Sequence, residues 1–194
     1  IALISLLMVA DYLLYPLWPS PDYPAATAHD NGLWLRHTWY FGERTDVDIK
    51  RLAKRLHDGK FRYAYCHVRY IKPDGRLRYR YPEAARHLVR TLHREAPGMN
   101  VIAWVYVGSE RGTPTVDVAD GAVRARMVRE AHWLVTACGF DGVQWDYEVC
   151  RNGDTRLLQL LDDTRAALPQ DALLACCANM WAPGPLRRWV GWDE

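Results

Sequence analysis

The sequence predicts an α/β fold in which parallel strands alternate with helices. Segments with strand-like and helix-like apolar patterns follow one another from residue 32 to residue 181, in units of roughly 30 to 40 residues, as right-handed crossovers require. One of them, NVIAWVYVG at 100–108, is the near-continuous apolar run of a strand covered on both faces. The 194 residues hold about five such units, whereas a TIM barrel has eight in roughly 250 residues. We therefore expect an incomplete parallel (β/α)8 barrel of the TIM type over residues 31–194, with a doubly wound open sheet as the rival fold.

An apolar segment precedes the predicted barrel. Residues 1–18, IALISLLMVADYLLYPLW, approach the length of a membrane-spanning helix, although Asp11 and Pro16 interrupt the run. We expect a membrane anchor or a signal-like helix, which would leave the protein membrane-anchored or exported to the periplasmic or extracellular side. A buried first helix of the domain is the alternative. Residues 19–30, rich in Pro, Ala and Asp, are expected to form a linker. The first residue is Ile and the last interrupts a pattern, so we expect a fragment of a longer protein.

Cap and turn signals predict the first elements of the domain. Residues 32–41 form an aromatic strand candidate. Thr45 then begins a helix with Asp48 at the capping-box position, and Gly59 ends it. Residues 61–68 form the second strand.

A turn signal follows the second strand. The segment RYIKPDGRLRYRY at 69–81 alternates around Pro-Asp-Gly, which predicts a hairpin inserted in a loop. The remaining predicted elements are a helix at 82–96, the strand at 100–108, a long helix that Gly139 closes, a strand at 141–148, a helix capped by Asn152 or Asp154, and a strand at 172–181.

The strand at 141–148, DGVQWDYE, holds the polar residues that suggest chemistry. Gln144, Asp146 and Glu148 are two residues apart, so on a strand their side chains point to one face. The residues between them point to the other face: Val143, Trp145 and Tyr147. Two carboxylates are costly to bury unless a charged, hydrogen-bonded or reactive group meets them. A strand end that opens into a cleft would provide that setting.

This stretch resembles the active-site strand of family 18 glycoside hydrolases, the chitinase-like enzymes. Their pattern is DxxDxDxE, often inside FDGhDhDhE, where h is apolar or aromatic. Residues 140–142, Asp146 and Glu148 match the pattern, whereas Gln144 stands in place of the middle Asp. The resemblance spans residues 31–181 and implies that the motif lies on the fourth strand, as the strand order above also predicts.

The resemblance implies a glycoside hydrolase that acts on a polysaccharide or oligosaccharide, such as an N-acetylhexosamine polymer of the chitin or peptidoglycan kind. It implies that Glu148 is the general acid that protonates the glycosidic oxygen. Asp146 would orient a substrate N-acetyl group that acts as the internal nucleophile. Gln144 still allows a hydrogen bond to Asp146, but not a pair of acids that share a proton. Asp141 has the opposite strand parity to Glu148, so we expect a structural role for it.

Side chains suited to sugar rings are expected to line the cleft. Besides the two acids, the predicted substrate-binding residues are Gln144, Tyr106, Trp39, Met180 and Trp181. Trp104 is a further candidate. For each aromatic residue, ordinary barrel packing is the alternative. The SxGG pattern of the family's third strand is absent, because WVYVGS stands there.

Composition gives little support to other partners. The net charge is only +2, so we expect no nucleic acid, and the absence of P-loop, HExxH and GxSxG motifs predicts no cofactor. The five cysteines lack metal-binding spacing and are expected to be small buried thiols, with one disulfide as the alternative. Residues 76–81 interleave Arg and aromatic residues as nucleic-acid binders do, although an exposed hairpin edge explains them as well. His67 and Arg69 follow the second strand, at the end where a cleft would open.

Two other classes of protein stay open. A sugar-binding protein on the same fold could have lost turnover, which the Gln144 substitution leaves open. A metal-dependent barrel enzyme could hold Mg²⁺ on Asp146 and Glu148, but the sequence offers no convincing third ligand. The expected partners are a carbohydrate substrate and, through residues 1–18, a membrane. The oligomeric state is left open.

Overall fold

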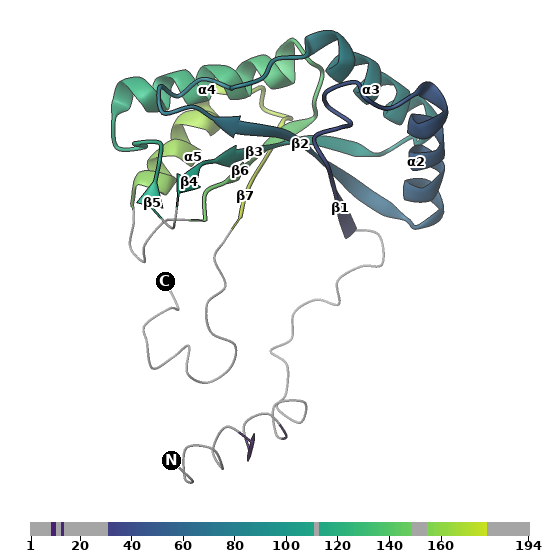
Figure 1. Ribbon diagram of the computed structural model, residues 1–194, viewed down its shortest axis with the longest axis horizontal. Helices are drawn as coiled ribbons and strands as arrows, with labels where there is room; N and C mark the ends of the chain where they lie inside the picture. The colour runs from purple at the N-terminus through teal and green to yellow at the C-terminus, as the bar shows by residue number, and fades with distance from the viewer. Residues whose placement is uncertain (1–8, 11–12, 14–30, 111–112, 149–154, 178–194) are drawn as a thin grey trace. The chain divides into compact units, whose positions relative to one another are not determined.

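The computed structural model of the chain describes residues 9–10, 13, 31–110, 113–148 and 155–177 (Figure 1). The chain divides into two units, residues 28–179 and the two ends 1–27 with 180–194. Nearly all described residues belong to the first of these units. The predicted linker at 19–30 and the predicted substrate contacts Met180 and Trp181 lie outside the described residues. Of the predicted apolar helix, only Val9, Ala10 and Leu13 are described, and they are helical.

Five parallel strands form the main sheet. They are β1 (Asn31–Leu35), β2 (Phe61–Ile71), β3 (Asn100–Val107), β6 (Gly142–Asp146) and β7 (Leu173–Cys176), in the spatial order β1-β2-β3-β6-β7. Two short antiparallel strands, β4 (Ser109–Glu110) and β5 (Thr113–Pro114), form a separate ribbon after β3. The sequence therefore correctly places the DGVQWDYE strand fourth in the main sheet.

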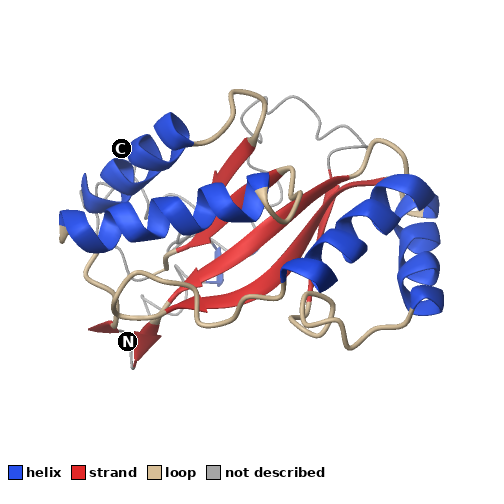
Figure 2. Ribbon diagram, turned by 90° about the horizontal axis from the view of Figure 1, so that it is seen from above, coloured by secondary structure: helices blue, strands red, loops and turns tan. Residues whose placement is uncertain are grey.

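The order of the strands decides between the two expected folds. Each new parallel strand is added on the same side of the previous one, so right-handed crossovers put every connecting helix on the same face. The helices are α2 (Asp46–Asp58), α3 (Pro82–Glu95), α4 (Gly121–Thr136) and α5 (Thr155–Ala167). They lie along one side of the sheet in Figures 1 and 2. A doubly wound fold would reverse the strand order and place helices on both faces, so the described part has the arrangement of a barrel segment.

Within the described residues, no helix is both long enough and apolar enough to cross a membrane.

The two faces of the sheet differ sharply in composition. The face toward the helices is buried and mostly aliphatic. It receives Val143 and Trp145 from β6 and Tyr147 from just after that strand. The other face carries aromatic and polar side chains, among them Trp104, Gln144 and Asp146. The parity predicted for this strand is therefore confirmed.

A hydrogen bond across this second face shows that the sheet is curved. Trp34 Nε1 of β1 donates to Gln144 Oε1 of β6 at 3.1 Å, although β2 and β3 lie between these strands. In a flat sheet, three strand spacings of about 4.8 Å would hold the two backbones about 14 Å apart. The contact therefore favours a sheet that curls toward the aromatic face, as the wall of a barrel does.

Some element ends agree with the sequence and others do not. Thr45 caps α2 in a full capping box with Asp48, and Gly59 ends the helix, as predicted. The strand predicted over 32–41 is too long, because β1 ends at Leu35 and a turn follows. Conversely, β2 continues to Ile71, and the predicted hairpin is reduced to one bridge, between Ile71 and Leu77.

The expected structural role of Asp141 is confirmed. Its Oδ2 lies 2.8 Å from His93 Nε2 of α3 and accepts a hydrogen bond from Val101 N of β3 at 2.6 Å. Asp141 thus fixes the start of β6 to its neighbouring strand and helix, at the opposite end from Asp146.

The prediction of buried thiols holds only in part. Cys66 and Cys138 are buried, Cys177 is partly buried and Cys176 is exposed, and all four are free thiols. Cys150 lies outside the described residues.

Candidate functional site

A cavity of about 540 Å³ opens at the carboxyl ends of β2, β3 and β6. Its lining residues are His67, Arg69, Tyr70, Trp104, Tyr106, Asp146 and Glu148. In parallel α/β folds, binding and catalytic groups gather at this end of the strands. The cavity is therefore the candidate functional site.

Asp146 is the most constrained residue of the cavity. It is the last residue of β6 and is only 6% exposed. Trp104 Nε1 donates to its Oδ2 at 2.7 Å, but its buried Oδ1 has no hydrogen-bond partner in the structure. A buried acceptor without a donor costs about 1 to 3 kcal/mol. A ligand that donates a hydrogen to Oδ1 would recover that cost.

Glu148 lies just past the end of β6 and is exposed, yet it lines the same cavity as Asp146. The two predicted catalytic residues are thus brought together at the predicted end of the strand. One acid is buried and hydrogen-bonded, whereas the other reaches solvent. This difference allows them different chemical roles.

Gln144 lies one step deeper than Asp146 and is buried. Register pairs it with Trp104 of β3, and its Oε1 accepts the hydrogen bond from Trp34. It does not line the cavity, so its contact to a ligand stays a prediction. Its present role is to join β1 to β6 beneath the site.

The predicted aromatic contacts divide into two groups. Tyr106 and Trp104 line the cavity. Trp39 lies in the turn after β1, packs against the core on the helix side, and has the Arg44 guanidinium 5.4 Å from its ring centroid. Trp39 is thus not among the residues that line the cavity, and its contact to a ligand stays a prediction.

His67 forms a neutral part of the wall. Its ring stacks on Trp104 with centroids 4.0 Å apart and an angle of 22° between the planes. Burial, helped by the positive charges of Arg69 and His37, lowers the pKa of His67 to about 4. The imidazole is therefore uncharged at neutral pH. Its Nε2 is buried and has no hydrogen-bond partner in the structure, so it is available to a polar ligand.

The end of β7 brings a thiol to the same place. Burial and the negative charges of Asp146 and Glu148 raise the pKa of Cys177 to about 12. This shift locates Cys177 beside the two acids, and it keeps the thiol protonated. Sequence reasoning missed Cys177, Tyr70 and Trp34. Alternation along β1 could have suggested that Trp34 faces the cavity side of the sheet, but not that it bonds to Gln144.

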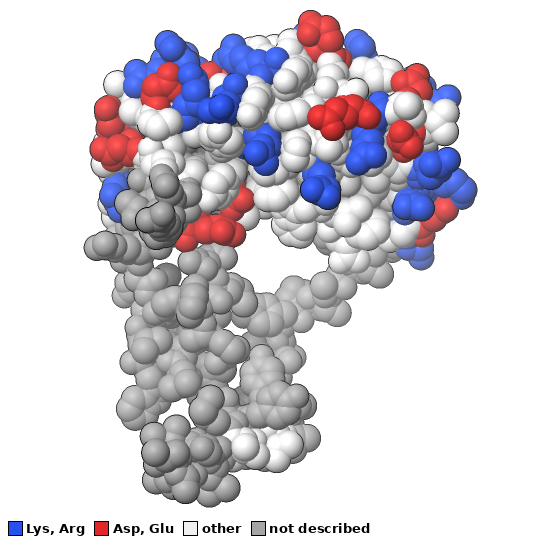
Figure 3. Space-filling view, in the orientation of Figure 1, with Lys and Arg blue, Asp and Glu red and all other residues white. Residues whose placement is uncertain are grey.

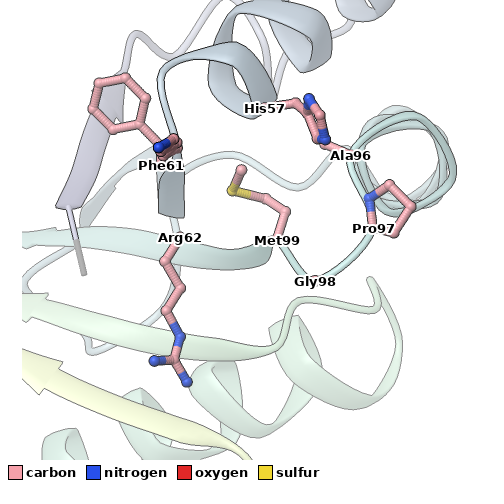
Figure 4. A pocket seen from close by; sticks show the side chains of 8 residues that line it. His57, Phe61, Arg62, Ala96, Pro97, Gly98 and Met99 are labelled. Carbon is pink, nitrogen blue, oxygen red and sulfur yellow. The ribbon is translucent and has the colours of Figure 1, made fainter. Parts of the chain in front are cut away.

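A second, smaller cavity of about 300 Å³ lies at the opposite ends of the strands (Figure 4). It is formed where α2 meets β2 and α3 meets β3, with His57, Arg62 and Met99 among its lining residues. Since conserved function in barrel folds gathers at the carboxyl ends, this cavity is not our candidate site.

Charges elsewhere are mixed in sign. On the face shown in Figure 3, Lys and Arg alternate with Asp and Glu over the described residues. Nor do three or more His, Cys, Asp or Glu side chains in the described ranges gather closely enough to hold a metal ion.

Comparisons with known proteins agree with the fold. No protein-family model matches the chain, and no curated protein matches it in sequence. Among solved structures, it is similar to the Bacillus cereus spore cortex-lytic enzyme SleL, at 14% identity and a TM-score of 0.58. It is also similar to a plant class V chitinase mutant from Cycas revoluta in complex with (GlcNAc)3, at 16% identity and a TM-score of 0.59. A third similar structure is the chitinase-like agglutinin RobpsCRA from Robinia pseudoacacia, at 16% identity and a TM-score of 0.56.

These similarities cover 76%, 76% and 75% of the chain but only 33%, 45% and 45% of the three solved proteins, in the same order. The chain thus spans less than half the length of the structures it matches. At such identities the likeness concerns the fold alone. The chain has the parallel βα architecture of chitinase-like barrels, with a cavity at the carboxyl ends of its strands.

Proposed function

We propose that the protein is a glycoside hydrolase that cleaves a polysaccharide or oligosaccharide containing N-acetylhexosamine. The observation that supports it most is the joint placement of Asp146 and Glu148 in one cavity, at the carboxyl end of the fourth strand of a chitinase-like fold. In this proposal residues 31–194 form part of a (β/α)8 catalytic domain.

Glu148 is the general acid in this mechanism. Its position past the strand end gives its carboxyl group access to solvent and to a glycosidic oxygen in the cavity. As the glycosidic bond breaks, Glu148 gives its proton to the leaving oxygen. It then takes a proton from the water that attacks the sugar.

Asp146 orients the nucleophile. The acetamido N–H of the substrate would donate to the unpartnered Oδ1, while Trp104 holds Oδ2. This aligns the acetamido carbonyl oxygen to attack the anomeric carbon, which is the substrate-assisted route. The negative charge of Asp146 stabilises the positive charge that develops on the acetamido group.

Replacement of Glu148 by Gln tests the proposal. The amide keeps the size of the side chain but cannot give a proton, so sugar release from chitin or cell-wall oligomers should fall by about 100-fold or more. Glu95→Gln, in an ion pair with Arg94 on α3, is the control and should keep wild-type activity. Equal sugar release by the wild type and Glu148→Gln would remove the acid assignment.

A carbohydrate-binding protein without turnover is the second candidate. Gln144 favours it, because the site has an amide beneath Asp146 in place of a second acid, and because RobpsCRA is described as an agglutinin. Oligosaccharide binding without sugar release, unchanged in Glu148→Gln, would support this candidate. Full activity after EDTA treatment would dismiss the metal-dependent alternative.

The proposed location is a membrane surface or the outside of the cell, through the apolar segment 1–18. Fractionation of cells that produce the protein tests it: recovery in the cytosolic fraction, with residues 1–18 present, would contradict it.

A further inference from the structure

Two arginines meet at a tyrosine on the β2 wall of the cavity. Arg69 and Tyr70 line the cavity, and the Arg69 guanidinium lies 5.8 Å from the Tyr70 ring centroid. The guanidinium of Arg78 lies 5.5 Å from the same centroid. One aromatic ring at the cavity therefore contacts two cations.

An irregularity in β2 brings two consecutive residues, Arg69 and Tyr70, to the cavity. The register between β2 and β3 shifts between His67 and Arg69, and Arg69 has a φ of +74°. Along β2 the buried core residues Ala64, Cys66 and Val68 alternate with residues of the other face, so Arg69 lies on the same face as His67. The bulge inserts one extra residue at this point, so Tyr70, directly after Arg69, also reaches the cavity. A positive φ is uncommon for a non-glycine residue and has a cost, which a functional role would explain.

The hairpin holds Arg78 in place. Its backbone N–H donates to Tyr70 O at 3.1 Å, which sets the two residues side by side. The tip of the hairpin rests on α4, where Arg126 donates to Asp74 O. A side chain at Gly75 would come within 2.5 Å of Val123 O, so the tip packs closely. Arg78 is therefore presented from a fixed backbone.

Neither cation has a carboxylate partner among the described residues, unlike its neighbours on the hairpin. Arg76 pairs with Asp74 at 3.7 Å, and Arg80 pairs with the buried Glu130 at 2.5 Å. Two neighbouring positive charges without a counter-ion repel each other, and an anion between them would remove that repulsion.

We propose that Arg69 and Arg78, held by Tyr70, form a subsite for a carboxylate carried by the sugar, so that the substrate is an acidic glycan in preference to neutral chitin. This inference rests on the proposed carbohydrate function. Arg forms paired hydrogen bonds with carboxylates. The Tyr70 ring contacts both guanidinium groups, and Arg78 Nε also donates to the Tyr79 hydroxyl at 3.1 Å, which helps to hold Arg78 in position. The acids Asp146 and Glu148 come from β6, beyond β3, so the bound carboxylate would sit on the opposite wall from them.

Binding of two matched tetrasaccharides tests the subsite. One is the N-acetylglucosamine tetramer, and the other alternates N-acetylglucosamine with N-acetylmuramic acid and carries no peptide. Affinities are measured by calorimetry on the Glu148→Gln protein, so that neither probe is cleaved. We expect the acidic probe to bind about tenfold more tightly, since each paired arginine contact at a partly exposed site contributes a few-fold.

Arg69→Gln and Arg78→Gln should each reduce that preference by about threefold, and the double variant should abolish it, while the neutral tetramer keeps its affinity. Arg76→Gln is the matched control on the same hairpin and should leave the preference unchanged, because the positive charge of Arg76 is already paired with Asp74. High salt should weaken only the binding of the acidic probe.

Three results would overturn the inference: equal affinity for the two probes, a preference that persists in the double variant, or binding of neither probe. Tighter binding of single-stranded RNA with the same arginine dependence would also overturn it. The proposed function fails separately. Sugar release equal in wild type and Glu148→Gln, with the arginine-dependent preference intact, would leave the subsite standing on a protein without the proposed catalysis.

Discussion

Replacement of His67 by Phe should flatten the acid side of the stability curve. His67 has a pKa of about 4 in the folded protein, against 6.5 in the unfolded chain, mainly because it is buried. Well above pH 6.5 it is neutral in both states and contributes no pH dependence. As the pH falls from 6.5 to 4, the unfolded state takes up a proton that the folded state does not, so the folded state loses stability. With 1.36 kcal/mol per pKa unit, the wild type should lose about 2 kcal/mol through this residue between pH 7 and pH 5.

The His67→Phe variant keeps an aromatic ring to stack on Trp104 and has no titrating group. Urea unfolding of the two proteins at pH 7 and pH 5, followed by tryptophan fluorescence, measures the difference. The free energy of unfolding should fall by about 2 kcal/mol less in the variant than in the wild type. His132→Gln, on the exposed side of α4, is the control and should keep the wild-type pH dependence. Equal losses in wild type and His67→Phe would show that the imidazole is not held neutral by its surroundings.

Two further outcomes follow from buried charges and thiols. Arg80→Ala leaves Glu130, 4% exposed, without its partner, and should lower the free energy of unfolding by about 2 kcal/mol, a value reduced because Arg80 is itself half exposed. In urea unfolding, Arg76→Ala should lower the free energy of unfolding by less than about 0.5 kcal/mol, because its pair with Asp74 is exposed. Equal losses in the two variants would show that the partly buried Arg80–Glu130 pair is no more important to stability than the exposed one. Asp146→Asn removes one of the charges that raise the pKa of Cys177, so iodoacetamide at pH 8 should modify Cys177 faster, as read by mass spectrometry. An unchanged rate of modification of Cys177 would show that the charge of Asp146 does not raise the pKa of this thiol.

Local patterns predicted the elements whose causes are local. The Thr45 capping box depends on residues three apart, and the two faces of β6 depend on simple alternation. The order of strands and helices also follows from local apolar patterns, so the barrel-type architecture could be predicted. The meeting of Asp146 and Glu148 follows from their spacing.

Features that depend on distant partners could not be predicted. The aromatic run after Leu35 is a turn because Tyr40 is fully buried, and its hydroxyl donates to Tyr79 O and accepts from Tyr81 N. These partners are about 40 residues away in the sequence. Likewise, the bulge that lets both Arg69 and Tyr70 line the cavity is defined only by register against β3, which a single sequence does not contain.

The Trp34–Gln144 hydrogen bond makes the site depend on the whole sheet. The two residues are 110 positions apart, and the bond forms only when β1, β2, β3 and β6 are assembled in register. A cavity-creating substitution in β2 or β3, remote from the acids, would therefore weaken the Trp34–Gln144 hydrogen bond beneath Asp146 before it unfolded the domain. Hydrogen exchange at Trp34 Nε1 would report that loosening, because its hydrogen bond to Gln144 depends on four strands at once.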